Sequence, residues 1–155
     1  MNTVRFIVIM IAFVLVAPFG FADGHGKSCN LEIASGDMLK FNKTVLEVSS
    51  SCDKVTVSFS HTGKLPATVM GHNWVLSKSA DVKAIAGDGL TAGASNGYIK
   101  PGDERVIAAT KIVGGGETAS VSFGAGQLSK NESYTFFCSF AGHSFMMAGA
   151  FKVID

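Results

Sequence analysis

The sequence predicts an all-β fold, a β-sandwich or barrel of short strands with one short inserted helix. Apolar residues alternate with polar ones in several short segments, which is typical of strands buried on one face. Glycine, serine and proline residues that favour turns recur between these segments. Only one stretch breaks the alternation and carries helix signals at both ends.

The alternation indicates where the individual strands lie. The early strands are expected around Leu31 and Ile33, around Leu46 and Val48, and around Val55, Val57 and Phe59. Later strands are expected at residues 105–110, 118–123, 133–138 and 149–154. Each strand presents one apolar face to a common core.

The inserted helix is expected from Ser79 to Ala86. Ser79 can cap its start, and Asp81 in the first turn favours the helix dipole. Gly87 is expected to stop the helix and to begin a glycine-rich surface loop that runs to Gly97.

Residues 1–22 have the pattern of a secretory signal peptide. Arg5 precedes a short apolar run that is followed by small residues. The run is too short for a stable membrane span, and an uncleaved anchor is the alternative. Cleavage after Ala22 would leave residues 23–28 as a flexible extension and residues 29–155 as one folded domain.

Charge balance narrows the classes of partner. The whole chain has 13 Lys and Arg and 12 Asp and Glu, and Arg5 is the only charged residue of the first 22, so 12 of each sign remain on a mature chain of 133 residues. Nucleic acids and anionic membranes attract concentrated positive charge, so a balanced chain argues against both as partners. This length suits one compact domain.

The segment from Cys138 to Met147 carries the clearest chemical signal. It places a thiol, the imidazole of His143 and a thioether at positions n, n+5 and n+9, donors that suit copper far better than calcium or magnesium. Residues 134–138 alternate as a strand, and Ala141-Gly142 permits a turn that folds His143 back towards the sulfur. Each residue alone would more often be ordinary core, so the spacing carries the signal.

A third strong ligand must come from elsewhere in the chain. The candidate is His72, within Val69-Met-Gly-His-Asn-Trp74, whose flanking residues suit a buried strand. Two imidazoles and a thiolate in a trigonal plane, with a distant thioether on the axis, form a blue-copper electron-transfer site.

With these residues the sequence resembles the cupredoxins, the type 1 blue copper proteins, and in particular the azurins. The matching segments are Val69–Trp74, Lys100–Ile107 and Phe136–His143 followed by Met147, and the resemblance extends from Cys29 to the end. It implies a cupredoxin-like Greek-key fold. Ala141 stands where the family usually has proline.

The resemblance also implies roles for individual residues. His72, Cys138 and His143 would be the equatorial copper ligands, with Met147 and the carbonyl of Gly71 as weak axial ligands. Asn73 and the backbone N–H of Phe140 would donate hydrogen bonds to the thiolate, which raises the reduction potential. An apolar docking patch would surround the edge of His143, formed by Leu65, Val69, Met70, Phe140 and Ala141.

Three cysteines leave one unpaired, and in an exported protein the odd thiol needs a reason. Metal ligation by Cys138 supplies it, and the remaining Cys29 and Cys52 can pair, as the resemblance also implies. The alternative, that one of these two is the ligand, is weak because neither has His or Met at a useful spacing. His61 continues the inward face of its strand, where we expect a buried imidazole bonded to a backbone carbonyl.

The resulting hypothesis is a periplasmic electron carrier with one type 1 copper per chain and no enzymatic activity. On family grounds its partners would be c-type cytochromes and periplasmic copper or haem reductases, and the chain would be monomeric. The alternatives are a copper transport or storage protein and a metalloenzyme, such as a copper oxidase or a zinc hydrolase. Three strong ligands and Met147 leave no open metal position, which argues against an enzyme.

A second metal site is conceivable at the expected mature N-terminus. Cleavage after Ala22 would expose Asp23-Gly24-His25, whose terminal amine, two amides and imidazole can bind copper(II) or nickel(II) in a square plane. A tail in which His25 has no role is the alternative.

Overall fold

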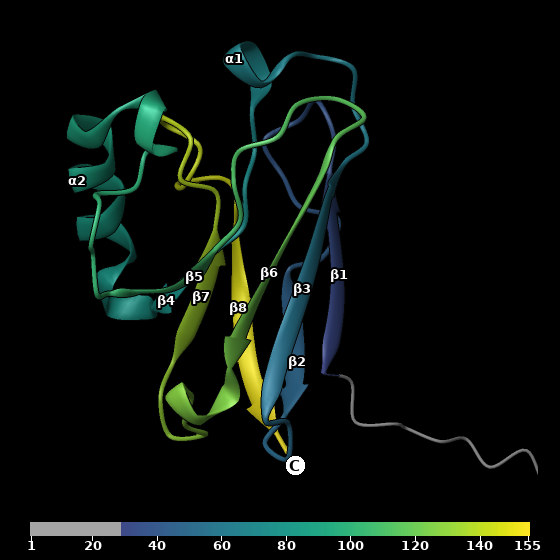
Figure 1. Cartoon of the computed structure of the whole chain (residues 1–155), viewed down its shortest axis with the longest axis vertical. Coiled ribbons are helices and arrows are strands. Elements are labelled where there is room, and N and C mark those ends of the chain that lie inside the picture. Colours follow the sequence, from purple (N-terminus) through teal and green to yellow (C-terminus); the bar gives the residue numbers. More distant parts are fainter. Residues whose placement is uncertain (1–28) are drawn as a thin grey trace, which may run out of the picture.

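The computed structural model describes residues 29–155, and the expected signal peptide and the Asp23-Gly24-His25 motif lie outside this part. Two sheets face each other and form a sandwich that is not closed into a barrel (Figure 1). One sheet has the order β1-β3-β6 and the other β2-β8-β7-β4-β5. The prediction of an all-β sandwich is therefore confirmed.

All strands but β4 occupy the expected segments within one or two residues, and β4 follows the segment around His72 in which a strand was expected. They are β1 (Asn30–Ser35), β2 (Val45–Ser49), β3 (Lys54–His61), β4 (Val75–Lys78), β5 (Val106–Ala109), β6 (Thr118–Gly124), β7 (Tyr134–Phe137) and β8 (Ala148–Ile154). β1 pairs with β3 and β2 with β8 in parallel, whereas the other pairings are antiparallel. Parallel neighbours that are not joined by a short turn are consistent with the Greek-key connectivity.

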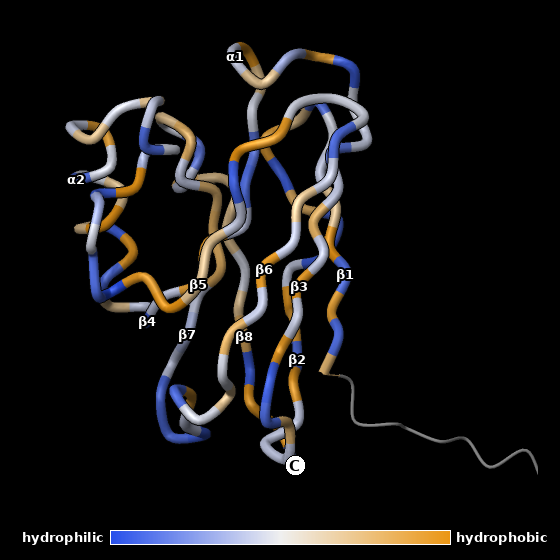
Figure 2. Tube along the Cα trace, in the orientation of Figure 1, coloured by the Kyte–Doolittle hydropathy of each residue, from blue (hydrophilic) through white to orange (hydrophobic). Residues whose placement is uncertain are grey.

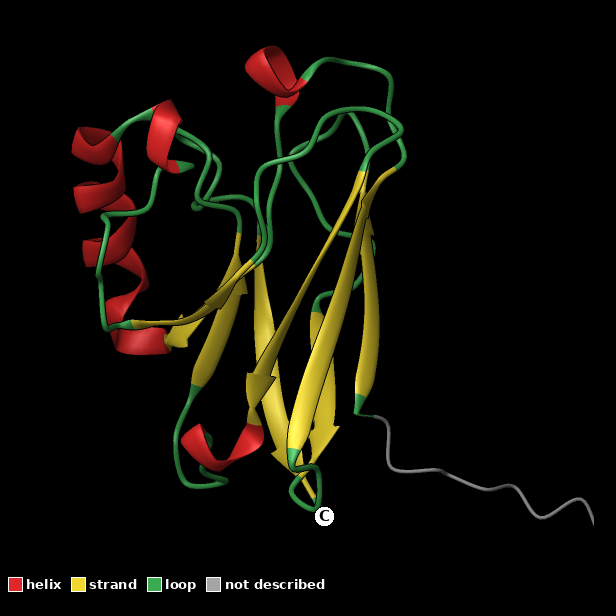
Figure 3. Ribbon diagram, viewed as in Figure 1, coloured by secondary structure: helices red, strands yellow, loops and turns green. Residues whose placement is uncertain are grey.

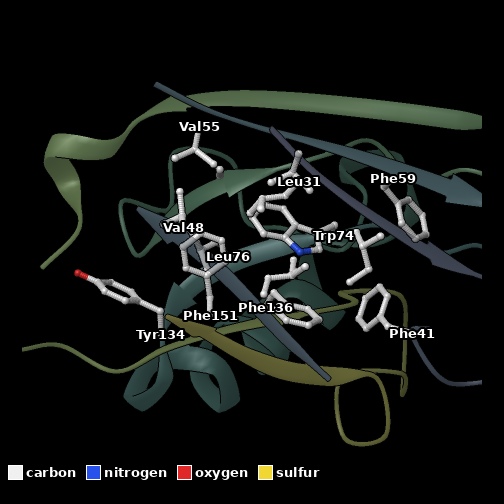
Figure 4. Close-up of a cluster of buried hydrophobic side chains, with 14 of the residues drawn as sticks. Leu31, Phe41, Val48, Val55, Phe59, Trp74, Leu76, Tyr134, Phe136 and Phe151 are labelled. Carbon is white, nitrogen blue, oxygen red and sulfur yellow. The ribbon is translucent and has the colours of Figure 1, made fainter. Parts of the chain in front are cut away.

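Period-two sequences generate the core between the sheets. Along β3 buried and exposed positions alternate, and Figure 2 shows the matching alternation of apolar and polar residues. The rings of Phe136 and Phe151 pack against that of Trp74 in this core, and Phe59 lies beside Phe41 (Figure 4). The Trp74 indole N–H is buried and has no hydrogen-bond partner within the described residues.

Strands β4 and β7 are covered on both faces. Their residues Leu76 and Phe136 belong to the main core, whereas Val75 and Phe137 pack against Ile85 of the helix α2 (Val82–Ala92). This helix lies beside the sandwich, outside the sheet formed by these strands (Figure 3). Burial on both faces explains why the neighbouring residues Phe136 and Phe137 of β7 are both apolar.

The helix differs from the prediction at both ends. A 3-10 turn (Ser79–Asp81) precedes α2, and the Ser79 hydroxyl bonds to Thr135 instead of capping it. The helix continues through Gly87 and Gly89 and ends at Ala92, and the next residue, Gly93, has φ of 75°. Gly89 is there for close approach, because a Cβ would lie 2.1 Å from the carbonyl oxygen of Tyr98.

Three further elements were not predicted. A single helical turn, α1 (Ala67–Met70), follows Pro66, and short 3-10 turns occupy Ala94–Asn96 and Ala125–Gln127. Within residues 29–155 no helix is long and apolar enough to cross a membrane.

A disulfide joins Cys29 to Cys52 across a separation of 23 residues, as the resemblance implies. Cys138 is buried and free among the described residues.

Candidate metal centre

Three buried side chains, those of His72, Cys138 and His143, converge on one site. The loops that carry them lie at the end of the sandwich opposite the C-terminus (Figure 1). His72 follows α1 and forms an isolated β-bridge with Val113, so it lies in a short extended segment before β4. Cys138 follows β7 directly, and His143 lies in the loop between β7 and β8. Their ligand atoms all lie within 4.8 Å of one another, and in the described part of the chain this is the one group of its kind.

The loop that carries two of these side chains is closed by its own backbone. The amide of His143 donates to the carbonyl of Phe140 at 2.9 Å, across a turn in which Gly142 has φ of 78°. The amide of Met147 donates to the backbone carbonyl of His143 at 2.8 Å, and the amide of Cys138 donates to the backbone carbonyl of Met147 at 3.0 Å. The turn at Gly142 therefore folds the imidazole back towards the sulfur, as the sequence predicts.

The three donor atoms form a nearly equilateral triangle. The two Nδ1 atoms of His72 and His143 are 3.2 Å apart, and the Cys138 Sγ lies 3.8 Å and 3.7 Å from them respectively. A point equidistant from atoms with these separations is about 2.1 Å from each. Metal–nitrogen bonds of about 2.0–2.1 Å and metal–sulfur bonds of about 2.3 Å are typical of such ligands, so the triangle fits one metal ion in its plane.

Hydrogen bonding fixes which nitrogen of His72 faces the triangle. Its Nε2 donates to the carbonyl oxygen of Gly36 at 3.0 Å. In the neutral imidazole the proton then sits on Nε2, and the Nδ1 lone pair points at the other two donors. Asp37 holds the Gly36 segment in place, because its carboxylate accepts the amide N–H groups of Lys64 and Leu65.

Burial keeps protons off the imidazoles and on the sulfur. Desolvation and the neighbouring His143 lower the pKa of His72 to about 4, and desolvation also lowers the pKa of His143. Desolvation raises the pKa of the Cys138 thiol to about 11, although the backbone N–H groups of Asn73 and Phe140 oppose this rise. Two neutral nitrogens and a sulfur whose charged form is costly without a cation are a donor set for a soft or borderline metal such as copper.

Backbone and side-chain bonds hold the sulfur's surroundings. The amide of Ser139 donates to Oδ1 of Asn73 at 2.9 Å, and Nδ2 of Asn73 donates to the Ser139 hydroxyl at 2.8 Å. That hydroxyl in turn donates to the carbonyl of Gly97 at 2.7 Å. The backbone N–H groups of Asn73 and Phe140 lower the pKa of the Cys138 thiol, and their role as hydrogen-bond donors to a metal-bound thiolate stays a prediction.

His61 lies directly behind His72. Its ring stacks on that of His72 at 5.0 Å and 15°. The amide of Gly63 donates to Nδ1, so Nε2 carries the proton and donates to the carbonyl of Met70 at 2.8 Å. The expectation of a buried, carbonyl-bonded imidazole is confirmed.

The two predicted axial residues, Gly71 and Met147, lie close in sequence to the residues whose atoms form the triangle. Met147 is fully buried at the end of the ligand loop, and Gly71 is buried immediately before His72. A Cβ on Gly71 would meet the Ala67 carbonyl oxygen at 2.2 Å and Ile112 at 2.6 Å, so this position accepts only glycine. Axial ligation by either residue stays a prediction.

The predicted docking patch lies in the loops around this centre. Leu65 and Val69 are 38% and 58% exposed, Ala141 is exposed, and Met70 and Phe140 are half-buried. The Phe140 ring contacts His143 at a centroid distance of 4.6 Å. Sequence reasoning missed Phe145 and Met146, which are 92% and 62% exposed on the ligand loop. Their place between His143 and Met147, in a loop with little room to bury both, was the available signal.

Comparison with known proteins agrees with this site. The model of the copper-binding plastocyanin/azurin family matches residues 27–154. Azurin of Bordetella pertussis is 52% identical over 127 residues, covering 82% of this chain and 85% of that protein. Azurin of Pseudomonas chlororaphis is 53% identical over 122 residues, covering 79% and 95%. A solved azurin structure from Methylomonas sp. strain J superposes with a TM-score of 0.80 at 50% identity, covering 83% and 99%.

Proposed function

This chain belongs to the copper-binding plastocyanin/azurin family and is a blue-copper electron carrier, and we propose that His72, Cys138 and His143 are the equatorial ligands of its copper. Met147 and the carbonyl of Gly71 complete the proposal as weak axial ligands. The observation that carries it is the buried triangle of two nitrogens and one sulfur, whose size fits one ion. When bound, the copper ion takes up and releases one electron between its +1 and +2 states.

The chain's part in electron transfer is to hold the donors still. Each donor is attached to a different piece of backbone that is itself fixed: His72 by Gly36 and Val113, Cys138 by β7, and His143 by its own turn. The geometry then changes little between oxidation states, which keeps the barrier to transfer low. The N–H groups that face Cys138 stabilise negative charge on sulfur and favour the reduced state.

The route for electrons runs through His143. Its side chain retains 7% exposure at the docking end, whereas His72 and Cys138 are fully buried. The exposed apolar residues around it, Leu65 and Val69 among them, form the patch at which a partner would approach. Such weak redox complexes bury little area, which suits brief encounters with c-type cytochromes and periplasmic reductases.

We further propose a periplasmic, monomeric protein without enzymatic activity. The leader pattern of residues 1–22 and the Cys29–Cys52 disulfide both favour an oxidising compartment outside the cytoplasm. The burial of all three donors argues against an open catalytic position, and it also favours slow metal exchange, unlike transport or storage.

A redox titration of the copper protein tests the function. We expect reversible uptake of one electron per chain, followed by absorbance, and the loss of this cycle in Cys138→Ser. A Cys138→Ser protein that cycles like the parent would refute the ligand assignment. Turnover of a substrate by the copper protein, absent in the variant, would favour an enzyme.

A further inference from the structure

The docking end of this chain carries free positive charge as well as apolar surface. Lys40, Lys64 and Lys111 are exposed, and none of the ion pairs among residues 29–155 involves them. The ion pairs of this part of the chain are made by Lys78, Arg105 and Lys130, which lie on other elements. We refer to Lys40, Lys64 and Lys111 as the lysine rim.

The hydrogen bonds tie the rim to the loops around His72. Lys64 lies beside the segment that ends at Lys40, because Asp37 binds the amides of Lys64 and Leu65. The amide of Gly115 donates to the Leu65 carbonyl at 2.8 Å, which joins the next loop to the same region. Lys111 precedes Ile112 and Val113, the residues packed against Gly71 and bridged to His72. All three loops lie at the end opposite the C-terminus (Figure 1).

The carboxylates in these loops are held by backbone donors. Asp37 accepts three bonds from the Lys64 and Leu65 amides, which lower its pKa, and Glu117 accepts the Gly114 amide at 2.9 Å. Both carboxylates therefore stay charged, and the three ammonium groups of the lysine rim outnumber them in these loops. Lys40, Lys64 and Lys111 are exposed, and so are the apolar side chains of Val69, Phe145 and Met146.

From this arrangement we propose that the lysine rim selects electron-transfer partners whose docking edge is apolar and surrounded by carboxylates. The rim draws such a partner to the end where His143 reaches the surface, and Phe145 and Met146 widen the apolar contact. A partner with a basic rim is repelled at the same place. Electrostatic complementarity of this kind acts on the rate of encounter more than on affinity, and it weakens as salt rises. The inference rests on the proposed electron-carrier function.

The test uses two small oxidants of opposite charge. Stopped-flow measurement follows the oxidation of the copper(I) protein to copper(II) by hexacyanoferrate(III), an anion, and by tris(1,10-phenanthroline)cobalt(III), a cation, each of which takes one electron. The variant Lys40→Gln/Lys64→Gln/Lys111→Gln removes the rim. The matched control Lys54→Gln/Lys83→Gln/Lys152→Gln removes the same net charge from exposed positions on β3, α2 and β8.

At an ionic strength of about 10 mM, where charges act over about 30 Å, we expect the rim variant to react about fivefold or more slowly with hexacyanoferrate(III) and faster with the cobalt complex. The control variant should change both rates much less, and high salt should abolish the difference. Equal effects of the two variants, or no effect of either, would overturn the proposal. A protein that shows no copper(I)/copper(II) cycle at all would instead overturn the proposed function.

Discussion

Metal uptake by this site should release close to one proton per chain over a wide range of pH. The thiol of Cys138, with a pKa raised to about 11, is protonated until well above neutrality and must lose its proton to bind a metal. His72, with a pKa lowered to about 4, is already neutral at pH 6, and His143 shifts in the same direction. The thiol proton is therefore released at both pH 6 and pH 9, and His72 adds almost nothing to it at either pH.

The magnitudes separate this expectation from that of unperturbed groups. At pH 9 a thiol with an ordinary pKa of about 8.5 would release only about a quarter of a proton, whereas Cys138 should release nearly a whole one. At pH 6 a histidine with an ordinary pKa of about 6.5 would add roughly three quarters of a proton, whereas His72 should add almost none. Because one proton competes with the metal, the apparent binding free energy should improve by about 1.4 kcal/mol per pH unit between these limits.

Isothermal titration calorimetry in two buffers of different ionisation enthalpy counts the protons. Zinc(II) serves as a redox-inert comparison, which separates proton release from oxidation of the thiol by copper(II). The Cys138→Ser protein should release almost no proton. Release of only a quarter of a proton per chain at pH 9, or of nearly two protons at pH 6, would refute the account of a desolvated site.

Three other predictions concern the scaffold and the axial position. The double variant Cys29→Ser/Cys52→Ser should have an unfolding free energy about 3 kcal/mol lower, because the unfolded chain regains the entropy of a loop with a separation of 23 residues. Chemical denaturation measures this change. Loss of the blue colour in this variant would contradict the pairing. Gly149→Ala should lower the unfolding free energy by about 2 kcal/mol or more, because the added Cβ would lie 2.2 Å from the buried Phe136 ring and 2.6 Å from the Thr44 carbonyl. Gly126→Ala is the matched control, and it should leave the unfolding free energy nearly unchanged because no atom lies within 4 Å of its added Cβ. Met147→Gln should lower the reduction potential measured by voltammetry, because a harder oxygen donor favours copper(II), and an unchanged or raised potential would argue against an axial role.

Local sequence signals predicted most of the fold, because the alternation of apolar and polar residues that indicates a strand can be seen in neighbouring residues. They failed where long-range packing decides the structure. In the sequence Gly87 and Gly89 indicate a helix stop, yet α2 continues through both. Gly89 is glycine because a side chain there would collide with the carbonyl of Tyr98, a contact between distant residues that the local sequence does not reveal. The position of β4 was also displaced, since His72 forms only a bridge to Val113 and the strand begins at Val75.

The candidate metal ligands could be predicted from the sequence because Cys and His side chains are recognisable as metal ligands by residue type. Cys138 and His143 share one short loop, and His72 lies in an apolar segment elsewhere in the chain. The contacts that orient them were not accessible. The Gly36 carbonyl that fixes the tautomer of His72 lies 36 residues away and has no side chain to mark it. The lysine rim likewise emerges only when three separate loops are folded to one end.

The visible absorption spectrum of the copper(II) protein tests the central claim most directly. A thiolate and two imidazoles in a buried plane should give an intense blue band from charge transfer between the Cys138 sulfur and copper. We expect this band in the parent protein and in Cys29→Ser/Cys52→Ser, and its absence in Cys138→Ser. A copper(II) protein that is colourless or only weakly coloured would contradict the assignment of Cys138, His72 and His143 as the site of electron transfer.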